Sequence, residues 1–344
     1  MEDAKAYSIK RDIVKHERSA VASKSFVKRV QLQSSAPLFS KQADLWLMRG
    51  ENRRRSPFRS KTVETYVSQI EKHLKPLIGE IPVDAIGNTV LKDVAAALSE
   101  KKLSAATIEL NLNIIKQIRA SVLDYEGAQV YPYTWNSDFI DAPVLNKKDQ
   151  KRPIANAQAV QAAISCGSPE QRALWAVLAG TGLRIAEALA LAIGEPDDGV
   201  STAWLPGQSK IIVRLQRRKK LFYSVKTEAG NREVDLPEVL NEYLKKIVER
   251  GPSIMFPYSE NHYRKQLKKC GVVGGFHSLR RFRVTHLRMQ GIPDALIHFW
   301  IGHEDSTVTG RYTEVGSEIQ SRKDRANQAG LGFQLPEASN VTEG

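Results

Sequence analysis

Four short segments in the second half of the chain carry side chains suited to an anionic ligand such as a phosphate. A guanidinium can hold two phosphate oxygens at once, and an imidazole can move a proton near neutral pH. His277 and Arg280 are three residues apart, which places both on one face of a helix. The segments are TGLRIAE with Arg184, VKTEAGNR with Lys226, HSLR with His277 and Arg280, and IGHEDSTVTGRYTE with His303 and Tyr312.

Taken alone, each segment is also typical of ordinary structure. An arginine on an amphipathic helix or a lysine at a hairpin usually serves solubility, and a tyrosine usually packs with its hydroxyl in water. Arg184 follows a glycine-flanked turn at a predicted helix start, where free N–H groups add a preference for anions. The four segments gain significance together, because they follow one another within one region of a strongly basic chain.

The charge of the chain points to a polyanionic partner. Its 344 residues have a formal net charge of +13 and a pI of about 9.6, which favours nucleic acid first and an anionic membrane surface second. The basic residues do not lie on one long amphipathic helix, which disfavours the membrane. Two cysteines are too few for a disulfide framework, and neither a signal peptide nor an apolar run of about 18 residues is present. We therefore expect a cytoplasmic, nucleoid-associated protein.

Helices must position these side chains. In the first half, apolar residues from Val63 to Leu74 predict a helix that Pro76 and Gly79 end. A further helix is expected at 90–98, and another after the N-cap Ser104.

In the second half, helices are predicted up to Ile164, over 171–179 and up to about Leu191. Three β-rich runs follow, at 211–215, 221–225 and 232–236, with a turn at 228–231 between the last two. After Pro237 the pattern is helical again.

Read in order, the four segments resemble the tyrosine recombinase (phage integrase) family. The family pattern is T-G-L-R-x-x-E, a lysine on a β-hairpin, H-x-L-R, L-G-H and a downstream tyrosine. The resemblance covers about Ile154 to Tyr312, and LSAATIELNLNIIKQIRASVLDYEG is similar to the last helices of the family's core-binding domain. The chain departs from the pattern at Ile301, where the family has leucine, and in the basic turn 216–220, which leaves the register of the sheet open.

The resemblance implies covalent transfer of a DNA strand through a 3′-phosphotyrosyl bond, with release of a 5′-hydroxyl. No metal and no cofactor is expected, because cationic side chains supply the charge stabilisation and the phosphotyrosyl bond retains the energy of the broken bond. Glu187 is expected to orient the site rather than to react. The implied catalytic residues are Arg184 and Arg280 on the non-bridging oxygens, His277 as base, Lys226 as general acid, His303 as phosphate ligand and Tyr312 as nucleophile.

The expected fold is mainly α with two domains. The first is a helical, SAM-like core-binding bundle, and the second a mixed α/β catalytic domain with a small three-stranded antiparallel sheet. The segment after Tyr312 is expected to form one short helix and a tail that docks on a neighbouring subunit. The expected ranges are a basic N-terminal segment at 1–35, the core-binding domain at 36–145, a linker at 146–153, the catalytic domain at 154–330 and a C-terminal tail at 331–344.

The implied partners are double-stranded DNA and further copies of the chain, as a tetramer on two DNA sites, with accessory DNA-bending or directionality factors and no membrane. Integration or excision of a phage or mobile element is the expected role. One alternative is DNA relaxation of the type IB topoisomerase kind, but the Gly-His turn nine residues before Tyr312 favours the recombinase. The other, a DNA-binding protein that does not cleave, is disfavoured because all six positions hold competent residues. The sequence leaves the target site, the accessory factors and cleavage in cis or in trans undetermined.

Overall fold

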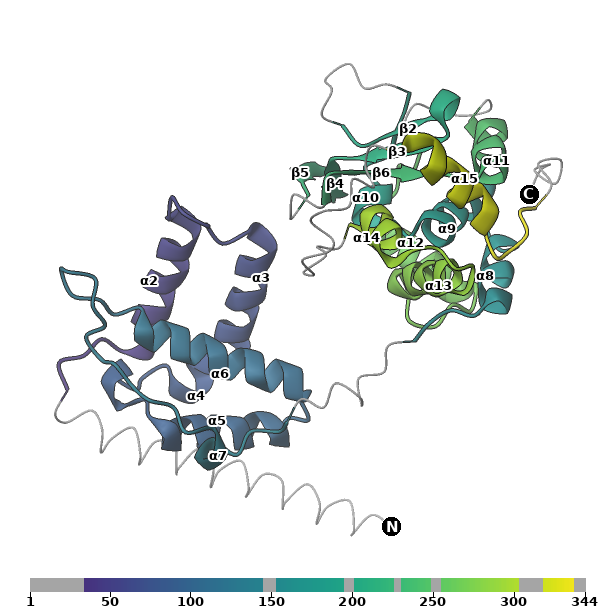
Figure 1. Cartoon of the computed structure of the whole chain (residues 1–344). Coiled ribbons are helices and arrows are strands. Elements are labelled where there is room, and N and C mark those ends of the chain that lie inside the picture. Colours follow the sequence, from purple (N-terminus) through teal and green to yellow (C-terminus); the bar gives the residue numbers. More distant parts are fainter. Residues whose placement is uncertain are drawn as a thin grey trace, which may run out of the picture. The chain divides into compact units, whose positions relative to one another are not determined.

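The computed structural model describes residues 34–144, 153–194, 201–225, 230–248, 255–302 and 318–336. Contacts divide the chain into two compact units, Met1–Gln150 and Lys151–Gly344, each with its own hydrophobic core. The first unit is helical, and the second combines helices with small sheets (Figure 1). Within the described ranges, no helix is both long and apolar enough to cross a membrane.

Amphipathic helices bury one face each to form the first unit. Helix α6 (Ala105–Ala120) packs against α2 and α5 (Figure 1). Its isoleucines are buried in the core. Ser104 is its N-cap, as predicted, and its hydroxyl accepts the Thr107 N–H at 3.2 Å. The other helices of this unit are α2 (Phe39–Asn52), α3 (Ser60–Gln69), α4 (Lys75–Ile78), α5 (Asn88–Glu100) and α7 (Ser137–Ile140).

The helix expected to end at Pro76 continues past it. Between α3 and α4 the chain forms a π-helical turn at Ile70–Leu74, after which the Lys75 N–H donates to the carbonyl of Ile70, five residues back. Pro76 then lies in the first turn of α4, where its missing N–H is not needed. Gly79 is the residue at which the helix ends, so that part of the prediction is confirmed.

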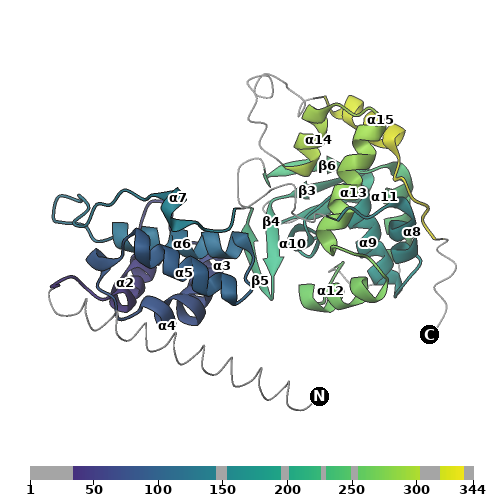
Figure 2. The same cartoon turned by 90° about the horizontal axis from the view of Figure 1, so that it is seen from below.

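Helix α9 (Pro169–Thr181) is the centre of the second unit, and all its residues from Ala173 onward are buried. Helices α8, α10, α11 and α13 pack around it (Figures 1 and 2). A helix surrounded in this way must be apolar on every side, which its ALWAVLAG sequence satisfies. The other helices are α8 (Ala157–Ile164), α10 (Ile185–Ala188), α11 (Glu238–Val248), α12 (Glu260–Lys269), α13 (Phe276–Met289), α14 (Asp294–Ile301) and α15 (Ile319–Ala329).

The strands do not form the predicted three-stranded antiparallel sheet. Four strands pair in the order β1-β2-β3-β6, with β1 and β2 parallel, and β4 and β5 form a separate hairpin. The expected pairing of β5 with β6 is therefore wrong, since β6 pairs with β3 instead. Strands β1 and β2 were missed because they are very short, and β2 is buried throughout and shows no alternation. The strands are β1 (Ala192–Ile193), β2 (Ala203–Leu205), β3 (Lys210–Val213), β4 (Leu215–Arg218), β5 (Leu221–Ser224) and β6 (Arg232–Asp235).

Helix α15, in the segment expected to dock on a neighbouring subunit, packs against its own unit. Its Arg322 is 2% exposed and donates to Asp235 at 3.0 Å and to Glu233 at 2.6 Å, both on β6. From α13, Arg283 donates to the Gly330 carbonyl just beyond the end of α15. Buried charge pairs and carbonyl contacts thus hold α15 to β6 and α13.

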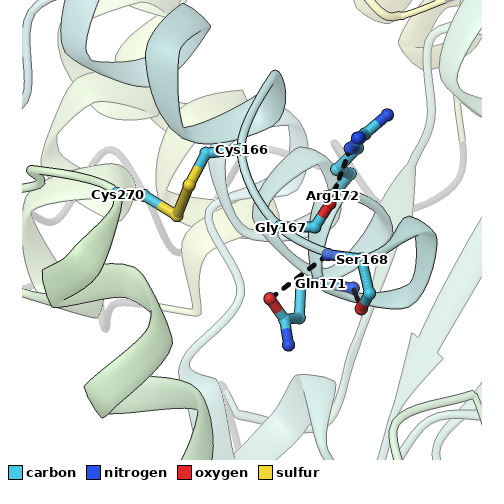
Figure 3. The surroundings of a disulfide bond; sticks show 6 residues. All are labelled: Cys166, Gly167, Ser168, Gln171, Arg172 and Cys270. Atoms are coloured by element: carbon cyan, nitrogen blue, oxygen red, sulfur yellow. Dashed lines mark hydrogen bonds between the residues drawn. A yellow bond between two sulfur atoms is a disulfide. The ribbon is translucent and has the colours of Figure 1, made fainter. Parts of the chain in front are cut away.

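A disulfide joins Cys166, which follows α8, to Cys270, the C-cap of α12 (Figure 3). The sequence analysis did not anticipate this bond, because the two cysteines are 104 residues apart and only the folded chain brings their Cα atoms to 5.8 Å. Beside it, Ser168 and Gln171 form the capping box that begins α9 (Figure 3). The bond therefore ties the start of the central helix to the segment that leads into α13.

Candidate functional site

Arg184 lies where α9 gives way to α10. Helix α9 ends at Gly182, whose φ of +73° is readily adopted by glycine, and Arg184 is the residue before α10. This confirms the predicted glycine turn and helix start, although α10 ends at Ala188 rather than near Leu191. The Arg184 side chain keeps 39% exposure, so its guanidinium remains open to a ligand.

Glu187 organises the start of α10. Its carboxylate accepts the Arg184 backbone N–H at 2.9 Å and the Arg184 Nη1 at 2.8 Å. The N–H of the N-cap residue is therefore already satisfied, and the Arg184 guanidinium is held beside the start of the helix. Burial would raise the pKa of Glu187, but the charges and hydrogen bonds of Arg232 and Arg184 outweigh it and lower the pKa.

Arg280 points inward from α13 towards the same turn. Its Nη1 donates to the Gly182 carbonyl at 2.6 Å, and its Nη2 donates to the Ile301 carbonyl at 2.7 Å. Burial, followed by the nearby charge of Arg184, lowers the pKa of Arg280 to about 9. The guanidinium therefore stays charged at pH 7, and its three remaining N–H groups are the ones that can serve a ligand.

His277 lies one turn earlier on α13 and is exposed. Partial loss of water around the ring, followed by the charges of Arg280, Arg281 and Arg184, lowers the pKa of His277 below its ordinary value of 6.5. The ring is therefore neutral at pH 7 and able to accept a proton. The positive charges that lower this pKa belong to Arg280, Arg281 and Arg184. An anion bound near them would be favourable, because its negative charge would offset theirs.

Helix α14 ends beside these arginines. Trp300 is buried and donates its Nε1 hydrogen to Asp235 at 2.8 Å, which anchors the helix to β6. The last carbonyls of a helix lack partners within it and lie at its negative end, where cations are favoured. Three arginines donate hydrogen bonds to the carbonyls at this end of the helix. They are Arg232 Nε to Trp300 O at 2.7 Å, Arg280 Nη2 to Ile301 O at 2.7 Å, and Arg184 Nη2 to Gly302 O at 3.4 Å.

Three of the six predicted catalytic residues, Lys226, His303 and Tyr312, lie outside the described residues. The other three, Arg184, His277 and Arg280, are brought together by the α9–α10 turn and α13. No three His, Cys, Asp or Glu side chains are grouped to hold a metal ion in the part of the chain that the structure describes.

Arg232 is a residue of this site that the sequence analysis missed. It begins β6, its side chain is 2% exposed, and its Nη2 donates to Glu187 at 2.9 Å. Its position in a strand of alternating residues gave no sign that it would meet α10. The sequence holds one weaker signal. A charged residue at an inward position of a short strand needs a buried partner, although the sequence does not say which one.

Comparison with solved structures identifies the fold. The Tn1549 transposon integrase in complex with a circular intermediate DNA matches with a TM-score of 0.59 at 16% identity, over 84% of this chain and 94% of that chain. A lambda integrase dimer bound to a COC′ core site matches with a TM-score of 0.55 at 14% identity, over 83% and 95%. A lambda integrase tetramer bound to a Holliday junction matches with 0.54 at 14% identity, over 85% and 79%. The chain therefore has an integrase-like fold.

The sequence places the chain in a family as well. The phage integrase family matches residues 144–318, just over half of the chain. No curated protein matches the chain significantly. The chain belongs to the phage integrase family, the tyrosine recombinases.

Proposed function

We propose that the protein is a site-specific DNA recombinase that cleaves and rejoins strands through a 3′-phosphotyrosyl intermediate. The observation that carries this proposal is the convergence of Arg184, Arg280 and His277 at one cationic turn, in the order and spacing of the family. A phosphodiester bound there would place its non-bridging oxygens near two charged guanidiniums, one of them already fixed by carbonyl contacts. The neutral His277 ring would stand beside it as a proton acceptor.

Tyr312 is the proposed nucleophile. Since an ordinary tyrosine has a pKa of about 10, its attack near pH 7 needs a base and a positive field, which His277 and the arginines supply. Lys226 is the proposed general acid for the leaving 5′-oxygen, and His303 the proposed hydrogen-bond donor to the phosphate. Glu187 holds Arg184 in place and takes no part in proton transfer, because its lowered pKa keeps it ionised.

The proposed substrate is double-stranded DNA, bound by both units, with the range 36–145 acting as the core-binding domain and 154–330 as the catalytic domain. The proposed assembly is a tetramer on two DNA sites, with accessory DNA-bending or directionality factors, acting in integration or excision of a phage or mobile element. The net charge of +13 supports a polyanionic partner. The solved relatives bound to a circular intermediate, a core site and a Holliday junction support the same class of substrate.

Trapping the covalent intermediate tests this proposal. Duplexes from DNA flanking the gene, nicked so that the released fragment diffuses away, are incubated with the wild type, with Tyr312→Phe and with Tyr258→Phe. Tyr258 is exposed and serves as the matched control. An adduct that survives SDS is expected from the wild type and from Tyr258→Phe, and none from Tyr312→Phe.

Two other results would change the assignment. An adduct with Tyr312→Phe would move the nucleophile to another tyrosine; Tyr263 is a poor candidate, because it is buried and donates to Glu170. Tight DNA binding without an adduct on any member of a random duplex library would identify a protein that binds DNA without cleaving it.

A further inference from the structure

Arg232 contacts three segments that the proposed mechanism needs. Its Nη2 and Nη1 donate to the two carboxylate oxygens of Glu187, at 2.9 Å and 3.4 Å. Its Nε donates to the Trp300 carbonyl at 2.7 Å, and its Nη1 also donates to the Gly230 carbonyl at 3.0 Å. One guanidinium thus joins α10, the end of α14 and the turn before β6.

Each of these segments leads directly to a proposed catalytic residue. Glu187 holds Arg184 through its backbone N–H and its guanidinium. Trp300 lies three residues before His303, and Gly230 lies four residues after Lys226. The Arg232 contacts are therefore made at residues that precede or follow three proposed catalytic residues closely in the sequence.

The surroundings of Arg232 fix its geometry. Its side chain is 2% exposed, and its partner Glu187 is 3% exposed, so water does not compete for these bonds. All three nitrogen atoms of the guanidinium are engaged, in a planar fork that a lysine ammonium cannot reproduce. The exposed side chains of the site are those of Arg184, at 39% exposure, and His277, so ligand binding and positioning fall to different residues.

We propose that Arg232 is a positioning residue that holds Glu187, and through it Arg184, in register with the end of α14 and the turn before β6, without contacting the DNA. This proposal rests on the proposed function. Removing the fork shifts these segments relative to one another while leaving the DNA-binding surface in place. A misplacement of the order of 1 Å at the reacting groups lowers a rate by about 100-fold.

The test compares Arg232→Lys with Arg119→Lys. Arg119 is the matched control, because its side chain is also buried and its guanidinium also holds several backbone carbonyls together, but it belongs to the first unit. Those carbonyls are the ones of Val83, Asp84 and Ile86. Three quantities are measured on the full chain: the melting temperature, the Kd for nicked duplex, and the single-turnover rate of adduct formation at saturating DNA. Assays run at a temperature at which circular dichroism shows each variant folded.

Both variants are expected to melt at lower temperature and to keep the wild-type Kd within about threefold, a difference of less than 1 kcal/mol. Only Arg232→Lys is expected to lose adduct formation, by about 100-fold. Equal rates for the two variants, or a loss in Kd as large as the loss in rate, would overturn the positioning role. So would an Arg232→Lys chain that is unfolded at every temperature, since Arg232 would then serve stability alone. Absence of an adduct from the wild type would instead overturn the proposed function, and this inference with it.

Discussion

Glu187 shows how one buried carboxylate organises several cations. It receives hydrogen bonds from the backbone and side chain of Arg184 and from the side chain of Arg232, so every oxygen has partners. Its lowered pKa means that it stays ionised through the neutral range. A permanent negative charge at this point lets the buried Arg232 and the partly exposed Arg184 lie close together, where they would otherwise repel each other.

His277 gives the pH dependence of the site. Because the pKa of His277 is lowered below 6.5, the rate of adduct formation at subsaturating DNA is expected to fall as the pH drops, with a midpoint below pH 6.5. The stability of the fold is expected to fall with pH as well. As the pH drops below 6.5, His277 takes up a proton in the unfolded chain before it does so in the folded chain, so acid destabilises the fold. Rates measured from pH 5 to 8 test this.

The control for this pH profile is His277→Asn, which is expected to lose the acid limb and to react about 100-fold more slowly. Two results would show that a group other than His277 causes the fall in rate at acid pH. One is a midpoint above pH 6.5, and the other is the same fall in the His277→Asn variant.

At the scale of elements, the turn between α9 and α10 and the end of α14 form one structure. Gly182 supplies a carbonyl to Arg280, and Ile301 at the end of α14 lies directly against Gly182. The turn requires a glycine because of its positive φ, and a Cβ at position 182 would meet Ile301 Cδ1 at 2.5 Å, so the end of the buried Ile301 side chain would have to move.

Gly182→Ala is accordingly expected to destabilise the chain. A left-handed backbone with a Cβ costs about 1–2 kcal/mol, and the contact with Ile301 adds about 1–3 kcal/mol. Gly194→Ala is the control, since Gly194 also has a positive φ of +84° but open space around it. The free energy of unfolding from urea titrations should therefore be lower for Gly182→Ala than for Gly194→Ala, by the contribution of the contact with Ile301. Equal free energies for the two variants would contradict a cost from that contact.

On the scale of the whole molecule, the chain consists of two units with separate cores, and the second is tied by a disulfide across 104 residues. Closing a loop of that length restricts the unfolded chain more than the folded one. The bond joins the end of α8 to the end of α12 and does not involve the elements that carry Arg184, His277 and Arg280.

Reduction of this bond is expected to lower the stability of the second unit. The stabilisation from closing such a loop is about 2–5 kcal/mol. Thermal melting with and without dithiothreitol measures it, and the Cys166→Ser, Cys270→Ser double variant provides the control, which should melt low in both conditions. A wild type whose melting is insensitive to dithiothreitol, and whose thiols react with maleimide before reduction, would show that the bond does not form.

The sequence by itself determined most of the helices and the residue types that meet at the turn between α9 and α10. The residue types of Arg184, His277 and Arg280, the glycine turn and the Ser104 cap are local, because each depends on a few neighbouring residues and on helical spacing. The tertiary structure decided the strand pairing, the disulfide and the contacts of Arg232. Those contacts join residues 45 and 68 positions apart, and no local pattern specifies which buried carbonyl or carboxylate a guanidinium will meet once the chain is packed.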